Sequence, residues 1–147
     1  MNPMGTIHEL LHQKGTTVWS IAPDLTVFEA IQMMADKNIG ALLVTEQDKL
    51  VGILTERDYT RKVALKGKSS KQTAVREIVG EVIHVSPSHS VEECMRLMTA
   101  HRVRHLAVLD TGRIVGIVSI GDLVNWTISA QNSTIHQLQT YISGYPG

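Results

Sequence analysis

The spacing of hydrophobic residues along the chain predicts two kinds of element. Two stretches place apolar residues at i, i+3, i+4 and i+7, which is typical of a helix with one buried face. Each is followed by two apolar runs separated by a polar turn, which indicates a β-hairpin. The helical positions are Val27, Ala30, Ile31 and Met34, then Val91, Cys94, Met95 and Met98, and the predicted hairpins pair 41–45 with 50–54 and 106–109 with 114–118.

Further elements complete each unit. Capping boxes at Thr26/Glu29 and at Ser90/Glu93 start the two amphipathic helices, because each hydroxyl and carboxylate serves a backbone N–H that the helix leaves unpaired. Short strands precede these helices, and a second helix follows each hairpin. The predicted strands cover 18–21 and 82–85, and the predicted second helices cover 56–66 and 120–130.

The two units are copies of each other. Residues 52–58 (GILTERD) return 64 positions later as residues 116–122 (GIVSIGD), and the same offset pairs Pro23 with Pro87 without a gap. A register kept over this length indicates a duplicated supersecondary unit. We therefore predict a strand-helix-strand-strand-helix repeat that occurs twice.

Flanking segments lie outside the copies. A short amphipathic helix over residues 6–14 is expected to pack on the outside, and a last helix starting at Ser133 or Thr134 has an apolar edge that the N-terminal helix or a dimer partner could cover. The predicted boundaries are 1–16 for the N-terminal flanking helix, 17–66 for repeat 1, 67–80 for a linker with a short helix over 73–79, 81–130 for repeat 2, 131–147 for the C-terminal flanking helix, and 17–130 for the two repeats together.

Composition narrows the functional classes. Lysine plus arginine and aspartate plus glutamate both number 14, so no net charge attracts nucleic acid or an anionic membrane. The single cysteine, Cys94, cannot form an internal disulfide, and its helical position predicts a small buried core residue. No apolar leader or run approaching 18 residues occurs, so a soluble, cytoplasmic protein is expected.

A hydroxyl-x-x-aspartate element ends each hairpin, as Thr55/Asp58 and as Ser119/Asp122. Such an element is itself a capping box, and most capping boxes only start helices. Its position here, at the end of a strand, adds free amides and a helix dipole that suit an anion. The hydroxyl could donate to phosphate, while the aspartate could accept from ribose hydroxyls.

These elements together resemble the CBS domain pair, or Bateman module, over roughly residues 17–128, and in particular its small stand-alone bacterial members. The resemblance implies an α/β (α+β) fold in which two β-α-β-β-α repeats pack with pseudo-twofold symmetry. It also implies a regulatory sensor rather than an enzyme. Adenine nucleotides such as AMP, ADP, ATP, S-adenosylmethionine or NAD would bind in two clefts, and a homodimer would signal to a separate regulated protein.

The resemblance also assigns site residues. Asp58 and Asp122 would hold ribose hydroxyls, and Thr55 and Ser119 would bond phosphate or ribose. Arg57 could add a cation to the first element. The second element has Ile120 and Gly121 at the positions that match Glu56 and Arg57. The walls of the adenine pocket would come from Val18, Trp19, Ile21, Ile39, Gly40, Ala41, Val82, His84, Val103, Arg104 and His105.

The copies differ just before the second strand of each repeat. Arg104 and His105 replace Gly40 and Ala41, and arginine is the side chain best suited to clamp phosphate. We expect a cleft that contains Ser119 and Asp122 together with Arg104 and His105 to bind phosphate better, and the other cleft to be looser or empty. Alanine at Asp122 would then weaken binding more than alanine at Asp58.

Other functions are less well supported by the sequence. The histidines His84, His89, His101 and His105 form no His-x-x-x-His helical pair, and no cysteine pair accompanies them, so no metal is expected. The phosphate loop of nucleotide hydrolases is absent, and no catalytic residue is assigned. The remaining alternative is a structural or protein-docking module with empty clefts. Neither nucleic acid nor membrane is expected as a partner.

Overall fold

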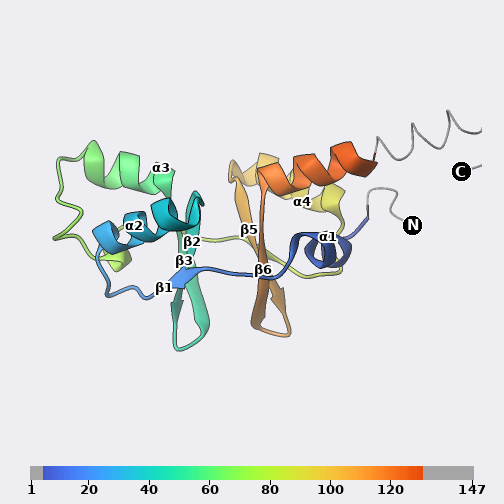
Figure 1. Ribbon diagram of the computed structural model, residues 1–147, viewed down its shortest axis with the longest axis horizontal. Coiled ribbons are helices and arrows are strands. Elements are labelled where there is room, and N and C mark those ends of the chain that lie inside the picture. Colours follow the sequence, from blue (N-terminus) through green and yellow to red (C-terminus); the bar gives the residue numbers. More distant parts are fainter. Residues whose placement is uncertain (1–4, 131–147) are drawn as a thin grey trace, which may run out of the picture.

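The computed structural model describes residues 5–130, and it places the two repeats side by side (Figure 1). Each repeat has a three-stranded sheet in which a short parallel strand joins an antiparallel hairpin. The predicted duplication and fold class are therefore confirmed. The first sheet consists of β1 (Ser20–Ile21), β2 (Ala41–Glu46) and β3 (Lys49–Thr55), and the second of β4 (His84–Val85), β5 (His105–Asp110) and β6 (Arg113–Ser119).

Both hairpins have the same register and the same kind of turn. Ala41 pairs with Thr55 in the first, and His105 pairs with Ser119 in the second. Each turn has two residues with positive φ. The values are 51° at Gln47 and 64° at Asp48 in the first turn, and 50° at Thr111 and 81° at Gly112 in the second. Such turns match the twist of the strands. The hairpins thus bring Thr55 and Ser119 to the same edge of their sheets.

The first helix of each repeat forms as predicted. These helices are α2 (Val27–Lys37) and α4 (Val91–His101), and both begin at a complete capping box. Both end at a residue in the left-handed conformation, Asn38 in the first repeat and Arg102 in the second. Their apolar stripes are buried against the sheets.

Four predicted elements differ from the structure. The strands β1 and β4 are only two residues long, because only two residues of each find a partner on the neighbouring strand. The predicted helix over 56–66 is divided into α3 (Glu56–Tyr59) and the π-helical turn η1 (Thr60–Ala64). The linker helix is the single 3₁₀ turn η2 (Val75–Glu77). By contrast, residues 120–130 are helical throughout.

Among residues 5–130 the hydrophobic core has three parts. One lies inside each repeat, and the third lies between the two sheets, where Leu43, Ile53 and Ala107 meet. Cys94 is fully buried in the second repeat, which confirms its predicted core position. Burial, together with the nearby carboxylate of Glu93, raises the pKa of its thiol to about 12. A thiol with such a high pKa is a poor nucleophile.

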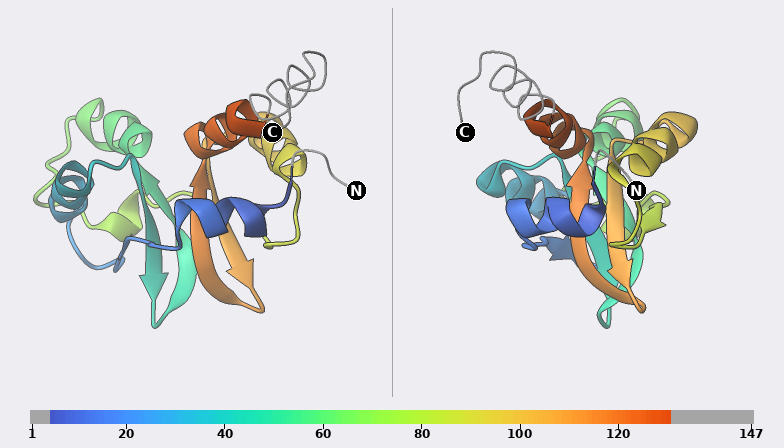
Figure 2. Two further views of the ribbon diagram at one scale, coloured as in Figure 1. Left: turned by 45° about the vertical axis from the view of Figure 1, so that its right-hand side comes forward. Right: turned by 90° about the vertical axis from the view of Figure 1, so that its right-hand side faces the viewer.

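The N-terminal helix α1 (Ile7–Lys14) is amphipathic, as its spacing predicted, and its apolar face forms part of the core of the second repeat. It lies across the second repeat (Figure 2), and its residues Ile7, Leu10 and Leu11 are buried in that repeat's core. The reason is geometric: the second repeat leaves an apolar face that three side chains at i, i+3 and i+4 can fill. The C-terminal flanking helix predicted over 131–147 falls outside the described residues.

Within residues 5–130, none of the helices has the length and apolar character needed to cross a membrane.

Candidate functional site

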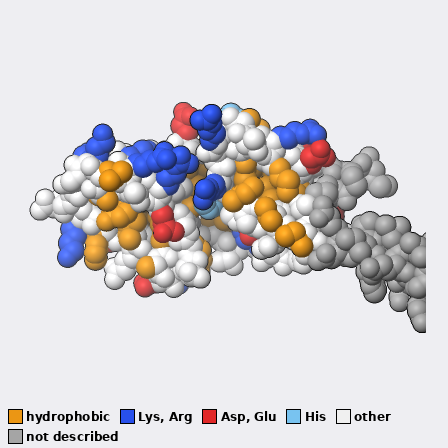
Figure 3. Space-filling model, turned by 90° about the horizontal axis from the view of Figure 1, so that it is seen from above, with side chains coloured by type: hydrophobic (Ala, Val, Ile, Leu, Met, Phe, Trp, Pro, Cys, Tyr) orange, Lys and Arg blue, Asp and Glu red, His pale blue; other side chains and the backbone are white. Residues whose placement is uncertain are grey.

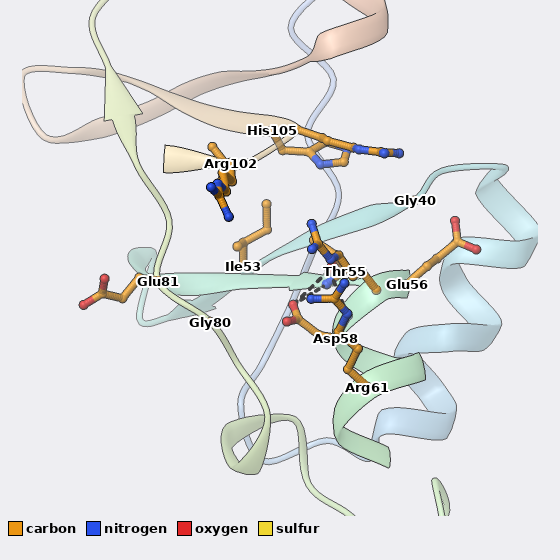
Figure 4. Close-up of a pocket in the computed structure, with 13 residues that line it drawn as sticks. Gly40, Ile53, Thr55, Glu56, Asp58, Arg61, Gly80, Glu81, Arg102 and His105 are labelled. Carbon is orange, nitrogen blue, oxygen red and sulfur yellow. Dashed lines mark hydrogen bonds between the residues drawn. The ribbon is translucent and has the colours of Figure 1, made fainter. Parts of the chain in front are cut away.

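A cavity of about 690 Å³ opens between the two repeats (Figure 4). This volume lies within the range of small-molecule binding sites, roughly 300–1,000 Å³. Both repeats contribute to it, and so does the linker that joins them. The lining residues are Gly40, Ile53, Thr55, Glu56, Arg57, Asp58, Arg61, Gly80, Glu81, Arg102, Val103, Arg104 and His105.

Thr55 and Asp58 form one wall of this cavity at the start of α3. The Asp58 carboxylate accepts hydrogen bonds from the backbone N–H and the hydroxyl of Thr55, both at 3.0 Å, and the Thr55 hydroxyl accepts from the N–H of Asp58 at 3.1 Å (Figure 4). The element is therefore a working capping box. The other carboxylate oxygen of Asp58 lies 3.2 Å from the ammonium of Lys62. These contacts fix the orientation of a carboxylate that faces the cavity.

The opposite wall comes from residues 102–105, between α4 and β5. Arg102 has a φ of 54°, in the left-handed region that arginine rarely adopts and that ends helix α4. The next turn is fixed by a hydrogen bond of 2.8 Å from the N–H of Ile120 to the carbonyl of Arg104. In the first repeat the matching bond, 3.0 Å long, joins Glu56 to Gly40. At the position of Arg104 the first repeat has Gly40, where an added Cβ would lie 3.0 Å from the carboxylate of Glu56.

The cavity is lined by more arginines than carboxylates, four against three. Two arginines, Arg57 and Arg61, come from the first repeat, and two more come from the second repeat. Three carboxylates, those of Glu56, Asp58 and Glu81, line it as well. Guanidinium groups bind phosphate in a two-pronged manner, so this set of side chains suits an anionic ligand.

His105 contributes a neutral ring rather than a cation. Burial lowers its pKa, the carboxylate of Asp122 opposes this effect, and the charges of Lys14 and Arg104 add to it. Because the folded-state pKa is lowered, the ring is neutral at pH 7. The stability that the neutral ring contributes is present above the ordinary pKa of about 6.5 and is lost as the pH falls through the lower folded-state pKa.

The second hydroxyl-x-x-aspartate element has different surroundings. Asp122 accepts from the N–H of Ser119 at 2.8 Å, and the Ser119 hydroxyl accepts from the N–H of Asp122 at 3.1 Å, so the capping box is the same. The Asp122 carboxylate is also in contact with the ammonium of Lys14, at 2.7 Å. It borders a hollow of about 280 Å³, lined in part by α1, rather than the large cavity.

Part of the expected grouping of Ser119 and Asp122 with Arg104 and His105 is present, because His105 pairs with Ser119 in the hairpin and the Asp122 carboxylate acts on the pKa of the His105 ring. Arg104 and His105 line the cavity that contains Thr55 and Asp58, and neither Ser119 nor Asp122 lines it. Arg104 and His105 therefore border the cleft that holds the capping box of the first repeat, although they lie next to the start of the helix that follows Ser119. The sequence register aligned these residues correctly but could not show which cleft they enter.

The structure brings together seven of the predicted site residues, namely Gly40, Thr55, Arg57, Asp58, Val103, Arg104 and His105. Four of the others belong to the hydrophobic core. Ala41 and Val82 belong to the core between the sheets, as does Val18, and Ile21 belongs to the core of the first repeat.

The remaining predicted residues lie at the surface or in a neighbouring hollow. Trp19 is 40% exposed, and the ammonium of Lys37 lies 4.2 Å from its ring centroid. Ile39 lines a hollow of about 450 Å³ beside α3. His84, Ile120 and Gly121 are exposed.

Six lining residues were not predicted: Ile53, Glu56, Arg61, Gly80, Glu81 and Arg102. A signal for Arg61 was present, because it follows Asp58 by three residues and so shares its helix face. Gly80 had no such signal. It reaches the cavity through a bridge in which its N–H and carbonyl both bond to Ile53, at 2.9 and 3.0 Å, and only the folded linker creates this bridge.

Comparison with known proteins extends these observations. The CBS domain family matches residues 15–65 and 75–129, which correspond to the two repeats. A mitochondrial CBS domain-containing protein of Arabidopsis thaliana, CBSX3, is 39% identical over 150 residues, covering 95% of this chain and 72% of the relative. The crystal structure of the CBS domain protein NE2398 is 53% identical with a TM-score of 0.81, over 84% of this chain and 97% of the other.

Two more distant structures add information on ligands and assembly. The CBS domain protein PAE2072 from Pyrobaculum aerophilum was solved in complex with AMP; it is 26% identical, with a TM-score of 0.71, over 80% of this chain and 88% of the other. A hexameric CBS-CP12 protein from bloom-forming cyanobacteria is 31% identical, with a TM-score of 0.74, over 83% and 70% of the two chains.

Within residues 5–130, no three histidine, cysteine, aspartate or glutamate side chains are placed to bind a metal ion together. The repeated fold, the two capping boxes and the family match agree with one another. The chain belongs to the CBS domain family, as a small protein with a tandem pair of CBS domains.

Proposed function

We propose that this protein is a regulatory sensor that binds an adenine nucleotide in the cavity between its repeats. The observation that carries the proposal is the composition of the cavity: Thr55 and Asp58 form one wall, and arginines from both repeats line it. A relative with 26% identity was solved with AMP, which supports this choice of ligand.

Each group has a role in this proposal. The Asp58 carboxylate would accept hydrogen bonds from the ribose hydroxyls, and Thr55 would donate to ribose or phosphate. Arg102 and Arg104 would clamp phosphate from the opposite wall, together with Arg57. Apolar contact with the base would come from the lining residues Ile53 and Val103.

Calorimetric titration with AMP, ADP, ATP, NAD and S-adenosylmethionine tests the proposal. We expect at least one of these nucleotides to bind with a micromolar dissociation constant, and affinity to fall with added salt because arginine–phosphate contacts are screened. Native mass spectrometry of the protein from its own cells would show whether the same nucleotide is retained. Absence of binding by all five would leave a structural or protein-docking module as the function.

The signal would be a population shift. The two repeats would have a closed arrangement, with the walls of the cavity close together, and an open one. A ligand that contacts both walls favours the closed arrangement, by as much as its affinity for the closed arrangement exceeds its affinity for the open one. A separate regulated protein would then recognise the altered surface.

A homodimer is the proposed assembly. Ile120, Val124 and Ile128 are 38%, 43% and 48% exposed, and their spacing forms an apolar stripe along the helix of residues 120–130. Seen from above, hydrophobic side chains gather over the second repeat, beside lysine and arginine side chains near the boundary between the repeats (Figure 3). A hexameric relative shows that CBS proteins do assemble.

The assembly can be tested by sedimentation velocity. We expect a dimer for the wild type and a monomer for Val124→Glu, because a charge in the centre of an apolar interface is not compensated. The exposed variant Lys66→Glu, outside this stripe, serves as the control and should remain dimeric. A wild type that sediments as a monomer at micromolar concentration would contradict the proposal.

A further inference from the structure

The segment that precedes each repeat packs on the other repeat. Residues before the first repeat cover the second, where Thr6 forms a β-bridge with Ser90. Residues before the second repeat cover the first, where Ala74 forms a β-bridge with Thr26, the counterpart of Ser90. The two covering segments, α1 with its cap and the linker around η2, are therefore equivalent by the pseudo-twofold symmetry.

The two segments end differently beside the aspartates. In the first repeat, the linker reaches Ile53, and the N–H of Gly80 donates to the carbonyl of Ile53 at 2.9 Å. In the second repeat, α1 is one turn longer, and the ammonium of Lys14 donates to the carbonyl of Ile117 at 2.5 Å. Ile117 is the counterpart of Ile53. A lysine side chain thus occupies the place that a glycine leaves open in the first repeat.

The same ammonium contacts Asp122. Lys14 lies 2.7 Å from the carboxylate that is the counterpart of Asp58, and its side chain is only 33% exposed. Asp58 also has a lysine partner, but Lys62 comes from its own helix and does not line the large cavity. Only in the second repeat does the lysine that contacts the aspartate belong to the covering segment.

We propose that Lys14 closes the second nucleotide site, so that each chain binds one nucleotide, at Asp58. This inference rests on the proposed function, because it concerns which of two equivalent aspartates can receive a ribose. A ribose at Asp122 would have to replace the Lys14 ammonium at both the carboxylate and the Ile117 carbonyl. The hollow that Asp122 borders, about 280 Å³, is under half the volume of the cavity at Asp58 and is lined only by residues of α1 and of the helix over 120–130.

The rest of α1 holds Lys14 in place. Ile7, Leu10 and Leu11 are buried in the second repeat, so the helix cannot turn outward without exposing them. A side-chain carbon on Gly116 would lie 2.8 Å from Leu11, which shows how closely the helix approaches β6. The closure is consequently a property of the folded chain rather than of a loose terminus.

Counting bound AMP tests the inference. The full chain is titrated with AMP in a calorimeter, and bound molecules are counted by native mass spectrometry. We expect one AMP per chain in the wild type and two in Lys14→Ala, and one again in the double variant Lys14→Ala/Asp122→Ala. The exposed Lys49→Ala is the control for loss of a lysine and should bind one.

The outcomes separate the two proposals. One AMP per chain in both the wild type and Lys14→Ala, or two in the wild type, overturns the closure by Lys14 and leaves the nucleotide site at Asp58 standing. Weaker binding in Lys14→Ala would also overturn it, since Lys14 would then assist binding. No AMP on any variant overturns the proposed function. Circular dichroism melting confirms that each variant is folded.

Discussion

Replacing Asp58 with alanine is expected to weaken nucleotide binding by at least about 30-fold, or about 2 kcal/mol. The carboxylate lines the large cavity, is oriented by Thr55, and would accept charge-assisted hydrogen bonds from two ribose hydroxyls. Titration of the folded variant with the nucleotide that the wild type binds measures the effect. Asp58→Asn, which keeps the shape and loses the charge, should give an intermediate loss.

The matched control is Asp122→Ala. It removes the same capping contact from the second repeat, so its cost to helix stability should be similar, about 1 kcal/mol. Binding should change by less than about twofold, because Asp122 does not line the large cavity and affects it only through the charge state of His105. An equal or larger loss in Asp122→Ala would contradict the assignment of the site to Asp58 and would restore the asymmetry expected from the sequence.

Replacing Gly52 with alanine is expected to destabilise the fold by about 3 kcal/mol and to lower the melting temperature by about 9 °C. A Cβ at this position would lie 2.4 Å from the backbone oxygen of Gly80 and 2.7 Å from Val79. The linker backbone would have to move away from β3. That movement would break the hydrogen bonds between Gly80 and Ile53 and deform one wall of the cavity. Thermal and urea denaturation measure the loss.

Gly116→Ala tests the reason for this loss. Gly116 is the counterpart of Gly52, but the added Cβ would meet only the side chain of Leu11, at 2.8 Å. A side chain can rotate where a backbone cannot, so the expected cost is about 1 kcal/mol. If both variants lose the same stability, contact with the linker backbone is not the cause of the loss in Gly52→Ala.

Local sequence patterns were sufficient for the architecture. The i, i+3, i+4, i+7 spacing and the capping hydroxyls predicted α2 and α4, because a helix must bury its apolar stripe and satisfy its first N–H groups. Two apolar runs separated by a short polar turn predicted each hairpin, and the register repeated after 64 residues predicted two equal units. Thr55 and Asp58 were also predicted from local sequence, because a hydroxyl and a carboxylate three residues apart come together at the first turn of a helix.

Contacts between segments far apart in the chain could not be predicted in this way. Spacing showed that α1 has an apolar face but not that the second repeat would bury it, because any apolar surface of suitable shape could do so. Likewise, the alignment placed Arg104 beside the second capping box, while the pseudo-twofold packing directs its side chain into the cavity of the first.

By itself, the sequence determined the repeated fold and the residues that cap each helix, because these depend on neighbours within a few positions. Only the tertiary structure decided which aspartate faces an open cavity. Asp58 and Asp122 share the same two backbone capping bonds, whereas the covering segment brings Gly80 to the first repeat and Lys14 to the second. Such a difference depends on long-range packing, which no local pattern encodes.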